Sequence, residues 1–108
     1  MDNNRLTFNE VNIGDVLCEI SYGTGQYASF YKVAAKKGKS TLVLTPMTNK
    51  YSYFYAGGTD GTAVPDKEES DRSISVRFSK NGRKITACRC GTGLEKWDGT
   101  PIEWHNYS

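Results

Sequence analysis

The aromatic side chains are the residues of this chain with the clearest capacity for chemistry, and that chemistry is binding. Seven tyrosines, four phenylalanines and two tryptophans among 108 residues are too many for a small core to bury entirely. Tyr51, Tyr53 and Tyr55 alternate and would share one face of a strand. Rows of rings beside basic residues stack nucleobases or contact a partner. The rings therefore predict a binding surface; the competing interpretation is that they only close the ends of a small barrel.

The predicted ligand- or partner-binding site combines such rings with one glutamine and with basic residues that would meet phosphate. Its members are Tyr22, Gln26, Tyr27, Tyr31, Tyr51, Tyr53, Tyr55, Arg77, Arg89 and Trp97. The first four come from the glycine-rich loop Gly23-Thr24-Gly25-Gln26 and its flanks. Phosphate-binding glycine loops lead into a helix whose free amides face the anion, whereas an alternating β pattern follows this one. The loop therefore predicts a hairpin turn that displays the neighbouring rings.

Catalytic and metal-binding patterns are weak in this sequence. Cys88 and Cys90 would point to one face of a strand, and with Cys18 and His105 they would supply four zinc ligands. Their spacing departs from the Cys-x2–4-Cys pairs of structural zinc sites. The single histidine, His105, lies close to the end of the chain, where frayed positions are common. We therefore predict a protein that is not an enzyme, with no catalytic residue, no metal and no cofactor.

Length, charge and cysteine count limit the class of protein. The net charge of +2, with 24% charged residues, is too balanced for a protein that mainly coats phosphate backbones. Three cysteines are an odd number, which disfavours a secreted disulfide scaffold and favours a reducing compartment. The first residues lack the layout of a signal peptide, and no segment approaches the roughly 18 apolar residues that span a membrane. We expect a cytoplasmic protein without a membrane partner.

Alternation of apolar and polar residues predicts β-strands along most of the chain. The predicted strands cover residues 15–22, 29–36, 40–48, 74–78 and 84–89, with a further short strand at 51–55. Pro46 indicates an edge or a bulge near the end of the third strand. Asn81-Gly82 tolerates positive φ and predicts a hairpin turn between the last two strands of the main set.

The same patterns define one domain over residues 1–108. Residues 1–12 form a lead-in that is either extended or contains one helical turn at 7–10, and no longer helix is supported. Residues 56–73, with Pro65 and an acidic run, predict a long loop insertion. Sequential strands with short links form an antiparallel meander whose edges close most simply as a barrel. The predicted fold is all-β: a small antiparallel barrel of five or six strands, SH3-like, with one long central loop.

Two motifs resemble known proteins. The stretch Val11-Asn12-Ile13-Gly14-Asp15-Val16 is similar to the first strand of many SH3-like barrels. Small uncharacterised β-barrel proteins of tailed phages and prophages resemble this chain at Tyr22-Gly23, Gln26, Phe30-Tyr31-Lys32-Val33 and Trp97-Asp98-Gly99-Thr100-Pro101. This resemblance implies a viral origin and a small accessory protein that blocks or sequesters a component of host defence.

Three functions follow as hypotheses. The first is a non-enzymatic inhibitor of host antiviral defence, acting in the host cytoplasm by blocking a host protein or by sequestering a small nucleotide signal. The second is an SH3- or OB-like module for single-stranded nucleic acid, which the net charge of +2 disfavours. The third is a minor virion or assembly protein. Edge strands and exposed tyrosines would also allow a homo-oligomer.

Overall fold

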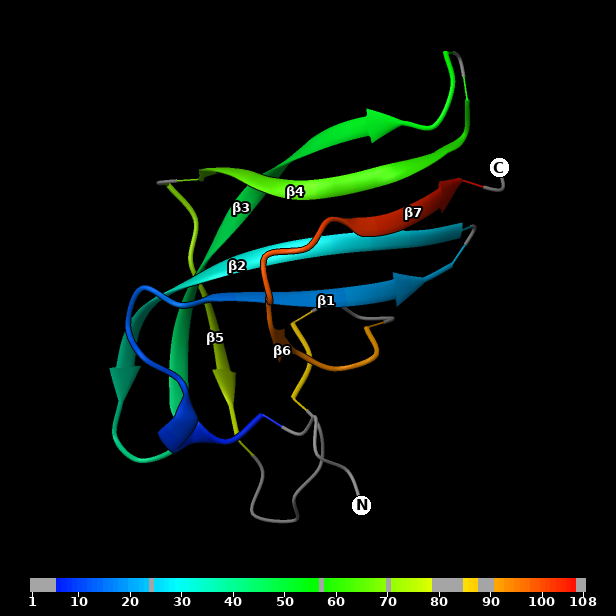
Figure 1. The fold of residues 1–108 in the computed structure, drawn as a ribbon. Helices are drawn as coiled ribbons and strands as arrows, with labels where there is room; N and C mark the ends of the chain where they lie inside the picture. Colours follow the sequence, from blue (N-terminus) through cyan, green and yellow to red (C-terminus); the bar gives the residue numbers. More distant parts are fainter. Residues whose placement is uncertain are drawn as a thin grey trace.

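The computed structural model describes residues 6–23, 25–56, 58–69, 71–78, 85–87 and 91–106 of the chain. Within these ranges a short 3-10 turn precedes seven strands (Figure 1). The elements are η1 (Phe8–Glu10), β1 (Val16–Tyr22), β2 (Gly25–Lys37), β3 (Thr41–Tyr53), β4 (Asp60–Glu68), β5 (Ile74–Arg77), β6 (Glu95–Lys96) and β7 (Ile102–Asn106). The all-β prediction and the single helical turn at residues 7–10 are both confirmed.

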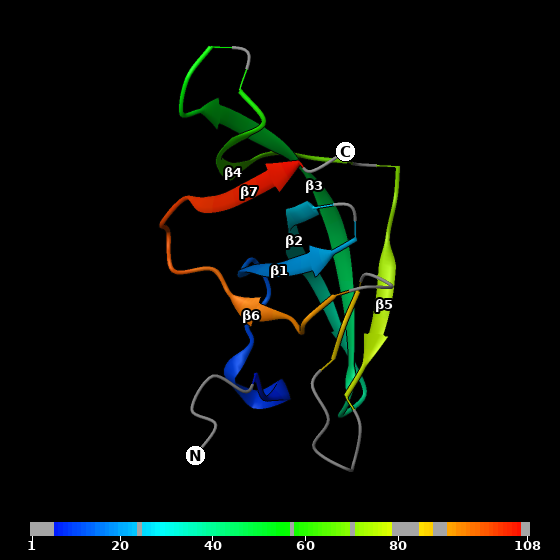
Figure 2. The same ribbon diagram turned by 90° about the vertical axis from the view of Figure 1, so that its right-hand side faces the viewer.

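Four antiparallel strands form a closed ring. β2 pairs with β3, β3 with β4, β4 with β7, and β7 returns to β2 at Gly25 and Gln26. β1 extends the sheet from β2, β6 adds to β1, and β5 adds to β3. In Figure 2, β5 and β7 lie at opposite margins of the molecule with β1, β2 and β3 between them. The predicted small antiparallel barrel is therefore confirmed, but the predicted five or six strands are corrected to a four-stranded ring with three added strands.

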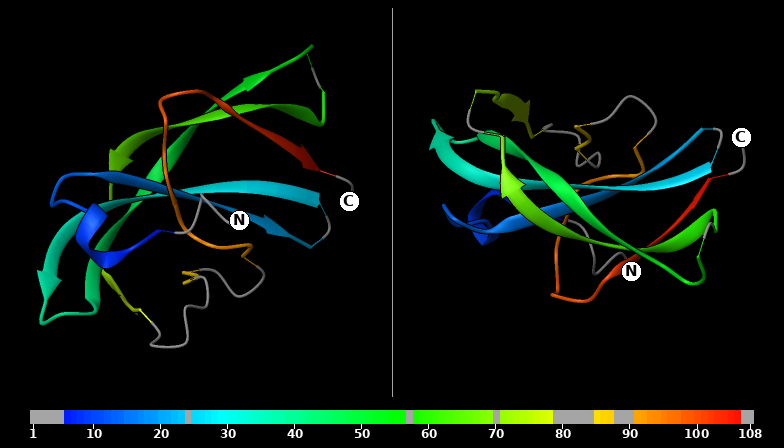
Figure 3. Two further views of the ribbon diagram at one scale, coloured as in Figure 1. Left: turned by 60° about the horizontal axis from the view of Figure 1, so that its bottom comes forward. Right: turned by 90° about the horizontal axis from the view of Figure 1, so that it is seen from above.

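Two long, bent strands make this closure geometrically feasible. β2 and β3 have 13 residues each, and each contains a register irregularity, at Val33/Ala35 and at Met47/Asn49. Such bulges bend a strand and increase its twist. Both views of Figure 3 show β2 and β3 together at their hairpin and diverging toward the other end. β4 and β7 occupy the space that this divergence opens. The bulge that Pro46 predicts begins one residue after that proline, at Met47.

The predicted loop insertion over residues 56–73 is wrong for its central half, because Asp60–Glu68 is β4. Its inward positions carry the small residues Gly61 and Ala63, which are both buried but give little β signal in a sequence. Pro65 pairs with Asn49 where the register shifts, a place where a missing N–H is tolerated. Contacts with β3 and β7, rather than local propensity, define this strand. The predicted strand at 51–55 is also corrected, since Tyr51 to Tyr53 is the end of β3.

The predicted hairpin after β5 is only partly visible. Asn81-Gly82 and half of the predicted return strand 84–89 lie outside the described residues, and the described half, 85–87, belongs to no strand. The Ala87 amide donates instead to the carboxylate of Glu19, with 2.9 Å between nitrogen and oxygen. A side-chain acceptor therefore takes the place that a strand partner would have filled.

Apolar residues form two cores because successive residues of β1 and β2 point to opposite faces of the sheet. The first core contains Leu6, Val11, Leu17, Tyr31, Val33, Leu42, Leu44, Val76, Ile85 and Leu94. The second contains Ala28, Phe30, Ala63 and Trp104, with Val16, Cys18, Met47, Trp97 and Ile102 packed against them. Both faces of the sheet are consequently buried over much of its length, and aromatic residues contribute to each core.

Candidate functional site

Rings from three strands meet at one end of the barrel. Tyr27 of β2, Tyr51 and Tyr53 of β3 and Trp104 of β7 line a pocket of about 300 Å³, together with Gly58, Thr59 and Asn106. We call these seven residues the aromatic corner. Tyr51 and Tyr53 are 51% and 58% exposed, whereas Trp104 is 8% exposed. The indole thus forms the inner wall, and the two tyrosines present their rings to solvent.

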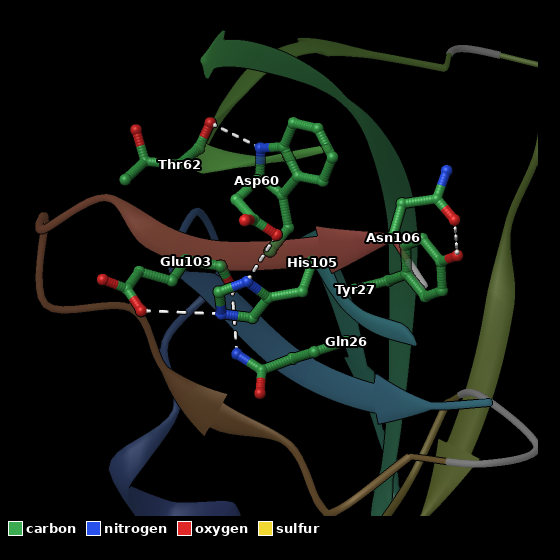
Figure 4. Close-up of polar contacts among 8 residues, drawn as sticks. Gln26, Tyr27, Asp60, Thr62, Glu103, His105 and Asn106 are labelled. Atoms are coloured by element: carbon green, nitrogen blue, oxygen red, sulfur yellow. Dashed lines mark hydrogen bonds and ion pairs between the residues drawn. The ribbon is translucent and has the colours of Figure 1, made fainter. Parts of the chain in front are cut away.

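The rings of the aromatic corner stand nearly at right angles. The centroid of Trp104 lies 5.4 Å from that of Tyr51, with 74° between the planes, and 5.3 Å from that of Tyr53, with 86°. These are favourable edge-to-face arrangements. The indole Nε1–H donates to the carbonyl oxygen of Thr62 at 3.1 Å and so fixes the ring against β4 (Figure 4). The inner wall is therefore held by both packing and a hydrogen bond.

Small residues on β4 allow this meeting of rings. Tyr53 and Trp104 lie on the two strands that flank β4, and both pair with Gly61. Tyr51 pairs with Ala63 in the same way. A hydrogen atom and a methyl group leave room across β4, so side chains from β3 and β7 can touch. A larger side chain at position 61 would separate them.

Hydrogen bonds hold the rim of the aromatic corner. The Tyr27 hydroxyl donates to Asn106 Oδ1 at 3.3 Å (Figure 4). Asn49 Nδ2 donates to the carbonyl oxygen of Ala28 at 2.8 Å and to the Tyr51 hydroxyl at 3.3 Å. These contacts tie β3 and β7 to β2 where the strands diverge. Two of the four rings are thereby fixed before any ligand arrives, which lowers the entropic cost of binding.

A histidine–carboxylate contact lies along the seam where β7 closes the ring. His105 Nδ1 is 2.9 Å from Asp60 Oδ1, and its Nε2 is 3.7 Å from Glu103 Oε2 (Figure 4). Gln26 Nε2 donates to the Glu103 carbonyl oxygen at 3.2 Å. The prediction that His105 is frayed is wrong, because β7 pairs with both β4 and β2 at this residue. Its imidazole joins two strands of the seam.

This seam has only part of a catalytic unit. A histidine oriented by a carboxylate becomes catalytic when it can activate a nucleophile. Cys88 and Cys90, the thiols considered for that role, lie outside the described residues. Across the ranges that the structure describes, no group of three or more His, Cys, Asp or Glu side chains is placed to hold a metal ion. In the described part of the chain, the contacts of His105 join β7 to β4.

Three of the predicted site residues come together in the aromatic corner: Tyr27, Tyr51 and Tyr53. Gln26 lies beside it, on the seam. Tyr55 lies beyond the end of β3, so the expected row of three tyrosines is shortened to two. The predicted set omits Trp104 and Asn106, although the alternation of Ile102 and Trp104 gives the signal of a short strand.

The remaining predicted residues lie elsewhere. Tyr31 is buried in the first core, and Trp97 packs edge-to-face on Phe30 in the second, with 5.7 Å between the centroids. Tyr22 is exposed at the end of β1, outside the aromatic corner. Arg77 is exposed on β5, where it pairs with the first residue of β3. Arg89 lies outside the described residues. The structure thus separates aromatic rings that pack in the two cores from aromatic rings that are exposed at the surface.

Cys18 has a strongly perturbed thiol. Burial raises the pKa of Cys18 to about 11, and the negative charges of Glu95, Asp98 and Glu19 act in the same direction. The thiol therefore stays protonated at neutral pH, and only the thiolate is nucleophilic. At pH 8 we expect iodoacetamide to alkylate Cys18 on the order of a hundredfold more slowly in the native protein than in denaturant. Peptide mapping by mass spectrometry measures this site by itself, and equal rates in the two states would contradict the prediction.

No protein-family model matches the sequence, and no curated protein or solved structure is significantly similar to it. Within the described ranges, no helix has the length and apolar character needed to cross a bilayer. The clearest indication of function in the chain is the aromatic corner, where rings from three strands meet at a pocket open to solvent.

Proposed function

We propose that this chain is a non-enzymatic binding protein that holds a group of another molecule in the aromatic corner. The observation that carries this proposal is the pocket of about 300 Å³ lined by four aromatic side chains, two of them more than half exposed. Large exposed rings are unfavourable in water unless a partner covers them. Rings held in place by hydrogen bonds and packing lose little entropy on binding, which makes them effective anchors.

A protein partner fits this surface better than a nucleic acid. The exposed rings continue past the pocket along the β3–β4 connection, through Phe54 and Tyr55. Tyrosine and phenylalanine are enriched at the centres of protein interfaces. A groove for single-stranded nucleic acid also needs cations along the backbone path, and none of the seven residues of the aromatic corner is Lys or Arg.

The resemblance to phage and prophage proteins supports a specific setting for this binding. We propose an inhibitor encoded by a phage that blocks a host defence protein in the host cytoplasm. Expression of the chain in bacterial strains that each carry one defence system should raise the plating efficiency of a sensitive phage on a protected strain. Tyr53→Ala should abolish that rise and Tyr22→Ala should keep it. Equal activity of both variants would contradict the aromatic corner as the blocking surface.

Selection of peptides tests the binding proposal without knowledge of the host target. A displayed random-peptide library is enriched on the wild-type protein, and the affinity of the selected peptides is then measured by calorimetry. Tyr53→Ala should weaken their binding by about 30-fold, the effect of losing a central interface ring. The matched control is Tyr22→Ala, since Tyr22 is 53% exposed but lies outside the pocket. Peptides that bind both variants equally well would show that the contact surface lies elsewhere.

A further inference from the structure

We infer that the group held in the aromatic corner is an organic cation: the guanidinium or ammonium head of an Arg or Lys side chain presented by the partner protein. This inference rests on the proposed binding function and specifies the chemistry of its central contact. It follows from the arrangement of the rings, from the charges around them and from the size of the pocket.

The ring arrangement brings aromatic rings to one pocket at steep angles to one another. Tyr51 and Tyr53 both meet Trp104 at steep angles, 74° and 86°. Walls at such angles let one entering group contact more than one ring. A cation is attracted by the negative face of an aromatic ring, most strongly by tryptophan. Because Trp104 is the buried wall, a cation that reaches it is also partly desolvated, which strengthens the attraction.

The described side chains that line the pocket offer no cationic partner to an anion. The polar side chains that line it, Thr59 and Asn106, are neutral. A broader hollow of about 570 Å³ shares Tyr27 and Tyr51 with the aromatic corner and reaches Glu69 and Arg72. Arg72 is the cation in that hollow, and its guanidinium is 3.1 Å from the Glu69 carboxylate.

The charged residues nearest in the sequence lie on the opposite face of the sheet. Asp60 and Glu103 adjoin Thr59 and Trp104, but both carboxylates contact His105, whose side chain alternates with that of Trp104 along β7. Lys50 adjoins Tyr51 on β3, but alternation along a strand directs its side chain to the other face. A phosphate group placed among the four rings would therefore lack a cationic partner in the lining, whereas a cation would meet aromatic rings and no like charge.

The size of the pocket matches a single head group. About 300 Å³ is at the low end of the range for small-molecule pockets, roughly 300 to 1,000 Å³. A planar guanidinium can stack on a ring and still donate an N–H group to the hydroxyl oxygen of Thr59 in the pocket lining. An ammonium or quaternary ammonium would use the ring faces alone.

The test is an NMR titration of the folded protein at constant ionic strength. The probes are the N-acetyl methylamides of arginine and lysine, tetramethylammonium, the neutral arginine analogue N-acetylcitrulline methylamide, and AMP. The cationic probes should give saturable shifts at the Trp104 indole and the Thr59 amide, with citrulline binding at least about tenfold more weakly than arginine. The relative affinities of the three cations then distinguish guanidinium from ammonium recognition.

Variants connect the signal to the rings. Tyr53→Ala should weaken arginine binding about 3- to 30-fold. Tyr53→Phe, which keeps the ring, and Tyr22→Ala, which lies outside the aromatic corner, should leave it unchanged. A weakening that Tyr53→Phe reproduces in full would place the effect on the hydroxyl and overturn a contact through the ring face.

The remaining outcomes separate this inference from the proposed function. Citrulline that binds as tightly as arginine, or AMP that shifts Trp104 when the cations do not, would overturn the cation while leaving a binding pocket at the aromatic corner. Selected peptides that require Tyr53 but contain no Arg or Lys would have the same consequence. Silence of every probe, together with peptides that do not need Tyr53, would overturn both.

Discussion

Gly61→Ala is expected to destabilise the protein by about 3 kcal/mol, measured as a lower urea midpoint in tryptophan fluorescence. A Cβ at this position would overlap the carbonyl oxygen of Ser52 and lie 2.9 Å from its carbonyl carbon. The obstacle is backbone of β3, which cannot rotate away as a side chain could. Gly61 is also buried between β3 and β7, so relief of the overlap requires the ring of strands to open.

The matched control is Gly23→Ala. An added Cβ at Gly23 meets no atom within 4 Å, and its backbone does not have the positive φ that favours glycine. We expect a change within about 0.5 kcal/mol there. Equal midpoints for the two variants would show that β4 can shift away from β3 at no cost. The same shift would separate Tyr53 from Trp104, so Gly61→Ala should also weaken binding at the aromatic corner.

Glu19→Ala is expected to cost about 3 to 5 kcal/mol. Glu19 is 1% exposed, and its two carboxylate oxygens accept hydrogen bonds from the amides of Ala87, at 2.9 Å, and Gly93, at 3.0 Å. Removal of the carboxylate leaves these two amides without their acceptor. It also frees the segment whose residues Ile85 and Leu94 pack in the first core. Urea denaturation measures the loss, and hydrogen exchange at the two amides should show that protection falls there first.

The position of Gly91 provides an internal check on this role. A Cβ at Gly91 would overlap the Glu19 carboxylate, so Gly91→Ala should be destabilising in the wild type and much less so in Glu19→Ala. Glu68→Ala is the surface control, because its 3.8 Å contact with Lys32 is solvent-exposed and worth about 1 kcal/mol or less. Additive effects of the changes at positions 19 and 91 would exclude direct contact between them.

The first half of the fold was predictable because its signals are local. The alternation of Val16, Cys18 and Ile20 with Leu17 and Glu19 is enough to identify β1. The predicted strand 29–36 lies within β2, and the predicted strand 40–48 begins one residue before β3 and otherwise lies within it. Each is extended in the structure because the neighbouring strand continues to offer backbone partners.

The second half of the fold was less predictable because long-range contacts define it. β4 has glycine, alanine and proline at positions where a strand pattern expects large apolar residues. β6 has only two residues, and β7 has five. None of these would be stable alone, and their pairing joins residues far apart in the chain, such as Gln26 with His105. The candidate site was hard to predict for the same reason, since Trp104 lies on β7.

The sequence by itself determined that the chain is an all-β barrel and that it has more aromatic side chains than a small core can bury. Only the tertiary structure decided which rings are available. Both faces of this sheet carry a core, so alternation along a strand does not separate inside from outside: Tyr31 and Trp97 are packed into the cores, whereas Tyr51 and Tyr53 remain at the surface. That division depends on where β7 closes the ring against β2 and β4, a pairing set by distant backbone partners rather than by any local pattern of residues.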